Sequence, residues 1–387
     1  MKVLYKTSSQ KKFFVSEIEC PHADEIFLSL DEEVDEVKDF LCITSSQKPK
    51  SLIVQDSYRL MRKKLSLTHD ELLKSVPQDN LKRGLANASE DLEAALEGDE
   101  DKEYLLTYLT IKRFLRSLSR PLVCKDRLRQ IASSEEHDAV ARRILELCPL
   151  KDGFAPRSVY NVAGSSTGRL TITRGPNILT TKAIARSALK SRYKNGRVLQ
   201  VDLSAAEPNI ALNALGLPLV DDVYSHISDK VLSGKVTRND AKLITLCALY
   251  GQSPKNLQKI LPDDVRPDYV IKKTREFFGA RDLERMLNNS HIKRNLRNVM
   301  GRPIKLNDAD RRLLVSYYLQ SSAAELSIVL FSELCKSLAH RMVPVYVIHD
   351  ALIIDWDQDL SREFLDKKII NLRMGTWSFN AKVTLIS

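Results

Sequence analysis

The sequence predicts a fold of the α/β type, more narrowly α+β, in which an antiparallel sheet accompanies mostly helical regions. Two apolar segments with strand character, residues 198–201 and 343–348, each lead into an aspartate, Asp202 and Asp350 respectively. Between them, residues 238–250 have the period of an amphipathic helix. Strand, cationic helix and strand in this order favour phosphoryl transfer from a nucleotide.

Composition indicates a protein of more than one domain with a polyanionic partner. A chain of 387 residues with 43% hydrophobic content can bury two or three cores. Its 60 basic and 50 acidic residues give a formal net charge of +10, which favours nucleic acid over an acidic metabolite.

The cysteines and the hydropathy pattern exclude several classes of protein. No C-x-x-C pair occurs, which predicts reduced thiols in a cytoplasm instead of disulfides or zinc. No apolar stretch approaches the roughly eighteen residues of a membrane span, so no membrane partner is expected. The six cysteines are Cys20, Cys42, Cys124, Cys148, Cys247 and Cys335.

The chain divides by pattern into three regions. Residues 1–75 mix short apolar runs with polar turns and predict a small α/β region. Residues 76–150 are predicted to be mainly helical, including an amphipathic helix over 104–116 with a basic end. From residue 151 the chain becomes rich in loops before the first aspartate-bearing strand.

The predicted helix over residues 238–250 carries a stripe suited to a nucleotide. Because four residues advance a helix by about 40° beyond a full turn, side chains at this spacing share one face. The cations on this face would take a triphosphate, and its apolar and aromatic members would offer a surface to the base. Thr237 is the predicted N-cap and Gly251 the predicted C-terminal residue. An ordinary amphipathic surface helix is the alternative. The stripe comprises Arg238, Lys242, Leu246 and Tyr250.

The two aspartates are candidates for metal ligands. Asp350 lies between two strand-like segments and is predicted at the tip of a tight hairpin. Two aspartates on adjacent strands can hold two divalent ions about 3.5–4 Å apart, which stabilise the attacking and leaving oxygens of an in-line displacement. Magnesium prefers few carboxylates together with phosphates and water. Taken singly, each aspartate is more often a turn or surface residue than a metal ligand.

The order of these segments resembles the polymerase region of family A DNA polymerases, the DNA polymerase I family, over roughly residues 155–387. Residues 202–207 resemble motif A, residues 238–251 resemble motif B, and residues 349–350 resemble motif C. Residues 167–170 with 176–177, 301–302 and 320–325 are similar to further family segments in the family's order.

The resemblance implies roles for individual residues. Asp202, Asp350 and the carbonyl of Leu203 would bind two Mg²⁺ ions, with Mn²⁺ as a substitute. Glu207 would block the 2′-hydroxyl of a ribonucleotide, which is rejection by a clash. Lys242 would bind the triphosphate with Arg238 and protonate the departing pyrophosphate, and Tyr250 would stack near the templating position and pack against Glu207. Five residues match family positions that contact primer, template or minor groove: Arg169, Asn177, Arg312, Gln320 and His349.

The chain departs from the family at several positions. Leu246 stands where an aromatic residue is usual, and Cys247 replaces a glycine, so stacking on the incoming base should weaken. Ala351 replaces the glutamate that usually follows the second aspartate. Pro208 and Asn209 replace a leucine and a primer-contacting arginine. We expect activity to survive because both principal aspartates remain.

The resemblance implies a compact right-hand polymerase. Its palm would span residues 151–387 with fingers inserted at about 215–300, residues 76–150 would form the thumb, and residues 1–75 would be an exonuclease vestige. Residues 31–33 and 55–59 only weakly match acidic exonuclease motifs, so proofreading is not expected.

The predicted substrates are primer–template DNA and dNTPs, in DNA replication or repair. A compact polymerase of this kind suits a phage, in a bacterial cytoplasm or infected host cell, with exonuclease, helicase or processivity factor on separate chains. Two alternatives stay open: a single-subunit RNA polymerase or primase-like enzyme, and a catalytically decayed DNA-binding protein.

Overall fold

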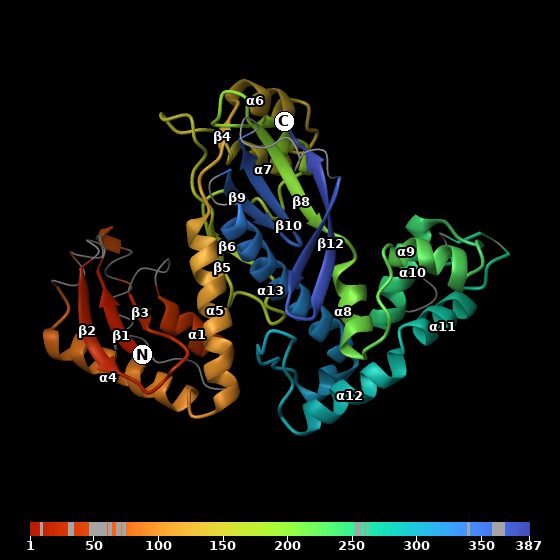
Figure 1. Cartoon of the computed structure of the whole chain (residues 1–387). Coiled ribbons are helices and arrows are strands. Elements are labelled where there is room, and N and C mark those ends of the chain that lie inside the picture. The colour runs from red at the N-terminus through yellow and green to blue at the C-terminus, as the bar shows by residue number, and fades with distance from the viewer. Residues whose placement is uncertain are drawn as a thin grey trace. The chain divides into compact units, whose positions relative to one another are not determined.

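The computed structural model describes residues 1–7, 11–29, 35–45, 60, 64–66, 71, 75–251, 257–258, 261–262, 264–338, 341–357 and 368–387. The chain forms two compact units (Figure 1). The first contains Met1–Arg113 and Met300–Pro303, and the second contains Phe114–Val299 and Ile304–Ser387.

The first unit packs helices on a small sheet. Its strands β1 (Lys2–Lys6), β2 (Lys12–Glu17) and β3 (Glu25–Leu28) have the order β2-β1-β3, with β1 antiparallel to β2 and parallel to β3. Its helices are α1 (Glu36–Thr44), α4 (Gln78–Ala95) and α5 (Asp99–Ser117), the last of which continues past Arg113.

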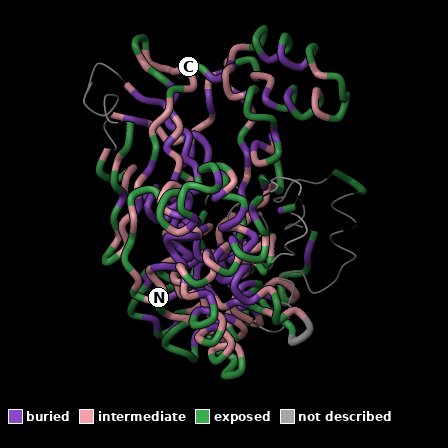
Figure 2. The backbone as a smooth tube through the Cα atoms, turned by 90° about the vertical axis from the view of Figure 1, so that its right-hand side faces the viewer, coloured by how far each residue is buried: buried purple, intermediate pink, exposed green. Residues whose placement is uncertain are grey.

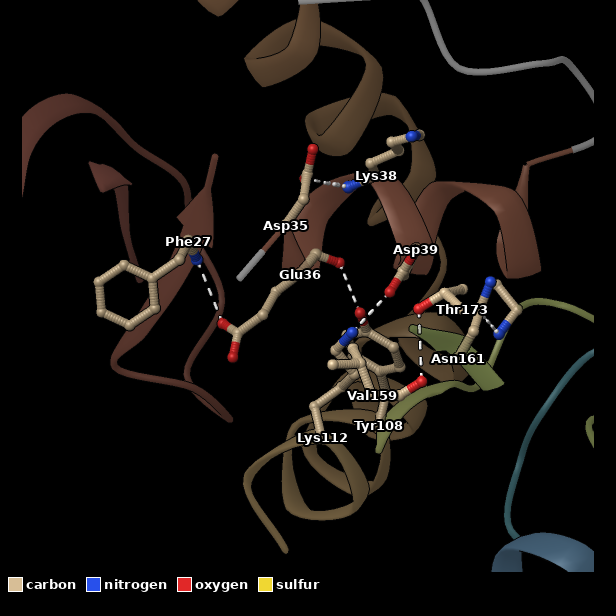
Figure 3. Close-up of polar contacts among 11 residues, drawn as sticks. Phe27, Asp35, Glu36, Lys38, Asp39, Tyr108, Lys112, Val159, Asn161 and Thr173 are labelled. Atoms are coloured by element: carbon tan, nitrogen blue, oxygen red, sulfur yellow. Dashed lines mark hydrogen bonds and ion pairs between the residues drawn. The ribbon is translucent and has the colours of Figure 1, made fainter. Parts of the chain in front are cut away.

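Polar contacts join α1 to α5 and β3 within this unit (Figure 3). The buried Tyr108 hydroxyl donates to the backbone carbonyl of Glu36 at 2.7 Å, and Lys112 pairs with Asp39 at 2.5 Å. The Glu36 carboxylate in turn accepts from the backbone N–H of Phe27 at 3.2 Å.

The division into units differs from the boundaries expected at residues 75 and 150. Helix α4 and most of α5 belong to the same compact unit as the N-terminal strands. The reason is long-range packing. The ring centroids of Tyr104 and Tyr108 lie 6.1 and 5.4 Å, respectively, from the ring centroid of Phe40 in α1. The weak exonuclease matches at residues 31–33 and 55–59 lie outside the described residues.

The second unit is built on a five-stranded antiparallel sheet of order β11-β12-β8-β10-β9. The expected antiparallel sheet with mostly helical surroundings is confirmed. Every residue of β10 is buried, so the sheet centre belongs to the core of this unit. The strands are β8 (Arg197–Leu203), β9 (Met342–Ile348), β10 (Ala351–Trp356), β11 (Ile369–Met374) and β12 (Trp377–Leu385).

Two short sheets and three short helices precede β8. Strand β4 (Leu122–Val123) pairs with β7 (Leu189–Lys190), and β5 (Val159–Asn161) pairs with β6 (Thr171–Arg174). Helices α6 (Lys125–Ser133), α7 (Asp138–Leu145) and the 3₁₀-helix η1 (Ala183–Ala188) complete this region. Helix α6 buries Leu128, Ile131 and Ala132, and Figure 2 shows how buried and exposed positions alternate along the backbone.

A helical region separates β8 from β9. It contains α8 (Ala206–Ala214), α9 (Val223–His226), a π-helix η2 (Ile227–Val231), α10 (Arg238–Tyr250), α11 (Pro267–Phe277), α12 (Ala280–Ile292), the 3₁₀-helix η4 (Asp308–Leu313) and α13 (Leu314–Ser337). Helix α10 packs against α9 and α11, and α13 packs against α8 and β9.

The bounds of α10 agree with the predicted helix, and both predicted ends are confirmed. The Thr237 hydroxyl accepts from the backbone N–H of Asp240 at 3.2 Å, while the Asp240 carboxylate accepts from the N–H of Thr237 at 3.1 Å. This reciprocal capping box satisfies two otherwise unpaired donors. Gly251 ends the helix with a φ of 65°, a conformation that glycine adopts without strain.

The expectation that no apolar stretch approaches the length of a membrane span is wrong. Among the described residues, the continuous helical stretch Asp310–Ser337, of mean hydropathy 1.3, is long and apolar enough to cross a membrane by length and composition alone. Most of it is buried inside the second unit, where a helix enclosed on all sides needs apolar residues all round. The burial of Ser321, Ser322 and Glu325 within it suits a core helix.

Candidate active site

The two aspartates lie close together, Asp202 on β8 and Asp350 in the turn of the neighbouring β9–β10 hairpin. Asp202, near the end of β8, pairs in register with Ala351, the residue directly after Asp350. The backbone N–H of Leu203 donates to the carbonyl of Asp350 at 3.0 Å. The predicted adjacency of the two acids and the hairpin placing Asp350 at its turn are therefore confirmed.

Left-handed backbone occurs beside each acid. His349, immediately before Asp350, has a φ of 55°, and Ala205, three residues after Asp202, has a φ of 49°. Neither residue is glycine, and this conformation costs about 1–2 kcal/mol per residue. Such strain is maintained only where the surrounding structure enforces it, and it concentrates at functional sites.

The surroundings of Asp202 raise its pKa. Burial, and then the neighbouring negative charge of Asp350, raise the pKa of Asp202 to about 6. The positive charge of Lys242 on α10, a hydrogen bond from Gln200 and the charge of Arg186 act in the opposite direction. Lys242 therefore lies close enough to the acid pair to influence its charge.

Two further side chains, Gln200 and Arg186, form a chain of hydrogen bonds that ends at Asp202. Gln200 lies two residues earlier, so both side chains leave the strand on one side. Arg186 of η1 donates from Nη1 to Oε1 of Gln200 at 2.9 Å. A guanidinium only donates hydrogen bonds, so Gln200 accepts from Arg186 with its amide oxygen. Its amide N–H groups then point away from Arg186 and donate to Asp202.

The acid pair fits magnesium. No group of three or more His, Cys, Asp or Glu side chains that could hold a metal occurs in the described part of the chain, so a protein-only cage is absent there. Mg²⁺ is instead usually held by one or two carboxylates, with phosphates and water completing its shell. Two crowded carboxylates with a raised pKa on Asp202 suit a divalent cation, which would relieve their repulsion.

The predicted stripe on α10 is present, and its side chains become less exposed from Arg238 toward Tyr250. Arg238 and Lys242 are exposed, whereas Leu246 and Tyr250 are partly buried. Arg238 does not lie alone, because its Nε donates to Asp222 at 2.8 Å. Burial by itself would raise the pKa of Asp222, but hydrogen bonds from Arg238 and Ser225 outweigh it and lower this pKa.

Glu207 links α8 to α10. The Tyr250 hydroxyl donates to its carboxylate, and Nη2 of Arg169 approaches the other oxygen at 3.3 Å. Burial raises the pKa of Glu207, Arg169 opposes that shift, and the charge of Asp350 adds to it. The predicted contact between Tyr250 and Glu207 is confirmed, and Glu207 lies within electrostatic range of Asp350.

Two cavities contain most of the remaining candidates. One of about 300 Å³ is lined by Arg169, Leu170, Glu207, Gln320, Ala323, Ala324, His349 and Asp350. Another of about 540 Å³ is lined by residues that include Tyr250 and Arg312. Asn177 lines neither cavity and lies in a turn, where its backbone N–H donates to Glu146 at 3.1 Å. Leu203 is buried on β8.

Four residues near the site were missed from the sequence. Gln200 could have been found, since strand alternation places it on the face of Asp202. Asp222 carries only the sequence signal of a helix N-cap, which indicates a structural role. Arg186 and Tyr224 carried no local signal, because only the folded chain brings them to the acids or to Arg238.

Comparison with known proteins bears on the fold. No protein-family model matches the sequence, and no curated protein matches it. The structure is similar to the solved POL domain of Pol1 from M. smegmatis in complex with DNA primer-template and dNTP, with a TM-score of 0.64 and 15% sequence identity. The similarity covers 91% of this chain and 81% of that one. The chain therefore has the fold of a DNA polymerase domain.

Proposed function

We propose that the protein is a template-directed DNA polymerase that adds dNTPs to a primer 3′-hydroxyl, without proofreading. The observation that carries the proposal is the adjacency of Asp202 and Asp350, with the charge of Lys242 close to them. These three groups come from a strand, a hairpin and a helix far apart in sequence. Their convergence on a polymerase fold supports this chemistry over a general DNA-binding role.

In this proposal the chain's own groups hold and orient the reactants. Asp202 and Asp350, with the carbonyl of Leu203, would hold two Mg²⁺ ions, and Mn²⁺ could replace them. Bound metal would supply stabilisation of charge on the attacking and leaving oxygens. Arg238 and Lys242 would bind the triphosphate, and Lys242 would deliver a proton to the departing pyrophosphate. Positioning and electrostatics dominate such reactions.

The remaining candidates fall into two roles. Glu207, fixed by Tyr250 and Arg169, would exclude the 2′-hydroxyl of a ribonucleotide. The other candidates would contact nucleic acid: Arg169, Gln320 and His349 from the cavity shared with Asp350, Arg312 from the cavity shared with Tyr250, and Asn177 from its turn.

The proposal also assigns the parts of a right hand. The five-stranded sheet would be the palm, and the helices within about residues 215–300 would be the fingers. The helices between residues 76 and 150 would act as the thumb. Leu246 and Ala351, which depart from the family pattern, leave both principal acids in place.

Primer extension tests the proposal. A short primer–template with Mg²⁺ is offered dNTPs or NTPs, and Asp350→Asn is compared with Asp229→Asn, which changes an exposed acid on the π-helix. We expect dNTP extension by the wild type and by Asp229→Asn, and a loss of about a thousandfold or more in Asp350→Asn, equivalent to about 4 kcal/mol of transition-state stabilisation.

The other outcomes of primer extension either identify a rival function or exclude the acid pair from the reaction. Preferential extension with NTPs would indicate an RNA polymerase or primase-like enzyme. Tight, metal-independent DNA binding without extension would indicate a decayed polymerase. Equal activity of Asp350→Asn and wild type would remove the acid pair from the mechanism.

A further inference from the structure

We propose that Asp222 and Tyr224 are positioning residues, which fix the guanidinium of Arg238 so that its two terminal amino groups stay available to the phosphates of an incoming nucleotide. The inference rests on the proposed polymerase function and deepens it. It assigns residues outside the recognised stripe of α10 to the binding of the triphosphate.

The first observation is which nitrogen of Arg238 is engaged. Asp222 accepts from Nε at 2.8 Å, on the inner side of the guanidinium fork. Within the described part of the chain, no hydrogen bond is found for Nη1 or Nη2 of Arg238. These two nitrogens form the edge of the fork that binds phosphate oxygens in a bidentate manner. The ion pair therefore orients the side chain without occupying its phosphate-binding edge.

The second observation is that Asp222 is itself immobilised. It is the N-cap of α9, where Oδ1 accepts from the backbone N–H groups of Tyr224 and Ser225, each at 3.2 Å. The Ser225 hydroxyl donates to Oδ2 at 3.0 Å, the same oxygen that receives Arg238. A carboxylate with these partners has little rotational freedom, so it can hold Arg238 in one direction.

The third observation is a ring against the guanidinium. The Tyr224 ring centroid lies 5.5 Å from the central carbon of Arg238, within range of a cation–π contact. Tyr224 is buried, and its burial, followed by the charges of Glu207 and Asp350, raises the pKa of its hydroxyl to about 12. The buried Tyr224 ring is therefore a fixed surface against which the guanidinium of Arg238 rests.

The exposure of the ion pair between Arg238 and Asp222 indicates that it adds little to the free energy of unfolding. The side chains of Arg238 and Asp222 are 53% and 43% exposed, and ion pairs at such positions contribute little to folding. A contact of this kind still restricts rotamers, which lowers the entropy lost when the side chain binds a ligand. Its effect should appear in nucleotide binding.

The test compares KM for dNTP with kcat in primer extension. Asp222→Asn keeps an N-cap residue for α9 but directs an amide donor, or a neutral oxygen, at Arg238. We expect KM to rise about fivefold to tenfold with kcat changed less than twofold, since orientation before binding is lost. Asp221→Asn, which alters the exposed neighbouring acid, is the matched control and should retain the wild-type KM.

Variants of Tyr224 and Arg238 complete the design. Tyr224→Leu removes the ring and should raise KM, whereas Tyr224→Phe keeps the ring and should raise it less. In the background of Arg238→Ala, Asp222→Asn should have no further effect on KM, because its only route to the nucleotide has been removed. Unchanged thermal unfolding of Asp222→Asn verifies that α9 is intact.

The outcomes separate this inference from the proposed function. Failure of the wild-type protein to extend any primer would overturn both. Extension by wild type with an unchanged KM in Asp222→Asn would overturn the inference alone. A lowered KM would also overturn it, because Asp222 would then compete with the triphosphate for Arg238.

Discussion

At the scale of single residues, Glu207 is held by two neighbours of different chemistry. Tyr250 donates a hydrogen bond from α10, and Arg169 contributes a positive charge at 3.3 Å. The side chain of Glu207 is only 16% exposed, so a lost donor leaves a buried carboxylate without full compensation. Its proposed action against ribonucleotides depends on this fixed position.

Tyr250→Phe tests that dependence. The change removes the hydroxyl and keeps the ring, so Glu207 gains freedom while stacking by residue 250 persists. Because a hydrogen bond to a charged group contributes about 1.5–3 kcal/mol, discrimination between dNTP and NTP should fall by about tenfold or more. The ratio of kcat/KM values for the two substrates is the measurement.

Glu207→Ala provides the upper limit for this effect, since it removes the blocking group altogether. Tyr250→Phe should relax selectivity less than Glu207→Ala does. Equal selectivity in all three proteins would show that residue 207 has no part in sugar discrimination.

At the scale of elements, local signals were sufficient for some helices and insufficient for others. The limits of α10 were predictable because Thr237 and Gly251 mark its ends through contacts within the same segment. The hairpin at Asp350 was predictable for the same reason, as its two strands flank the acid directly. Asp222 was not recognised, because its partner Arg238 lies 16 residues away on a separate helix.

Helix α1 contains a buried carboxyl at its start that predicts a pH dependence. Asp35 is the N-cap, accepting from the backbone N–H of Lys38 at 2.9 Å. Burial raises the pKa of Asp35 from 3.8 to about 7, the bond from Lys38 opposes this, and the charge of Asp39 adds to it. The folded state therefore favours the protonated acid. As pH rises from about 4 to 7, the unfolded chain loses this proton first, so the contribution of Asp35 to stability declines.

Asp35→Asn should remove this decline while keeping a good N-cap. We expect the free energy of unfolding of the variant to exceed that of wild type above pH 7, by at most about 4 kcal/mol, and to match it near pH 4. Denaturant unfolding at a series of pH values measures the difference. Asp24→Asn, at an exposed position in the same unit, should show no such pH-dependent gap.

At the scale of the whole molecule, the sequence predicted the mixed type of fold, whereas the packing of its compact units depends on long-range contacts. The mixed class and the antiparallel sheet followed from strand-like segments and helical periodicity. The grouping of α4 and most of α5 with the N-terminal strands depends on Tyr104 and Tyr108, which pack on distant α1 through aromatic contacts that no local pattern reveals. No apolar stretch of membrane-span length was expected from the sequence, yet the stretch that contains α13 has that length and composition, because a helix buried in a core is apolar on every side as a membrane span is.

The net charge of +10 leads to a last prediction about DNA binding. Lysines and arginines that neutralise phosphates release counterions, so the logarithm of the affinity falls linearly with that of salt concentration, by about 0.9 for each phosphate contacted. Arg312→Ala should reduce this slope by about one if Arg312 contacts a template phosphate. Arg238→Ala should leave the slope unchanged without nucleotide, because Arg238 is proposed to bind the triphosphate. Fluorescence anisotropy of labelled primer–template from 50 to 200 mM salt measures both. Affinity independent of salt would contradict phosphate contacts altogether, and an equal loss of slope in the two variants would place Arg238 on the DNA.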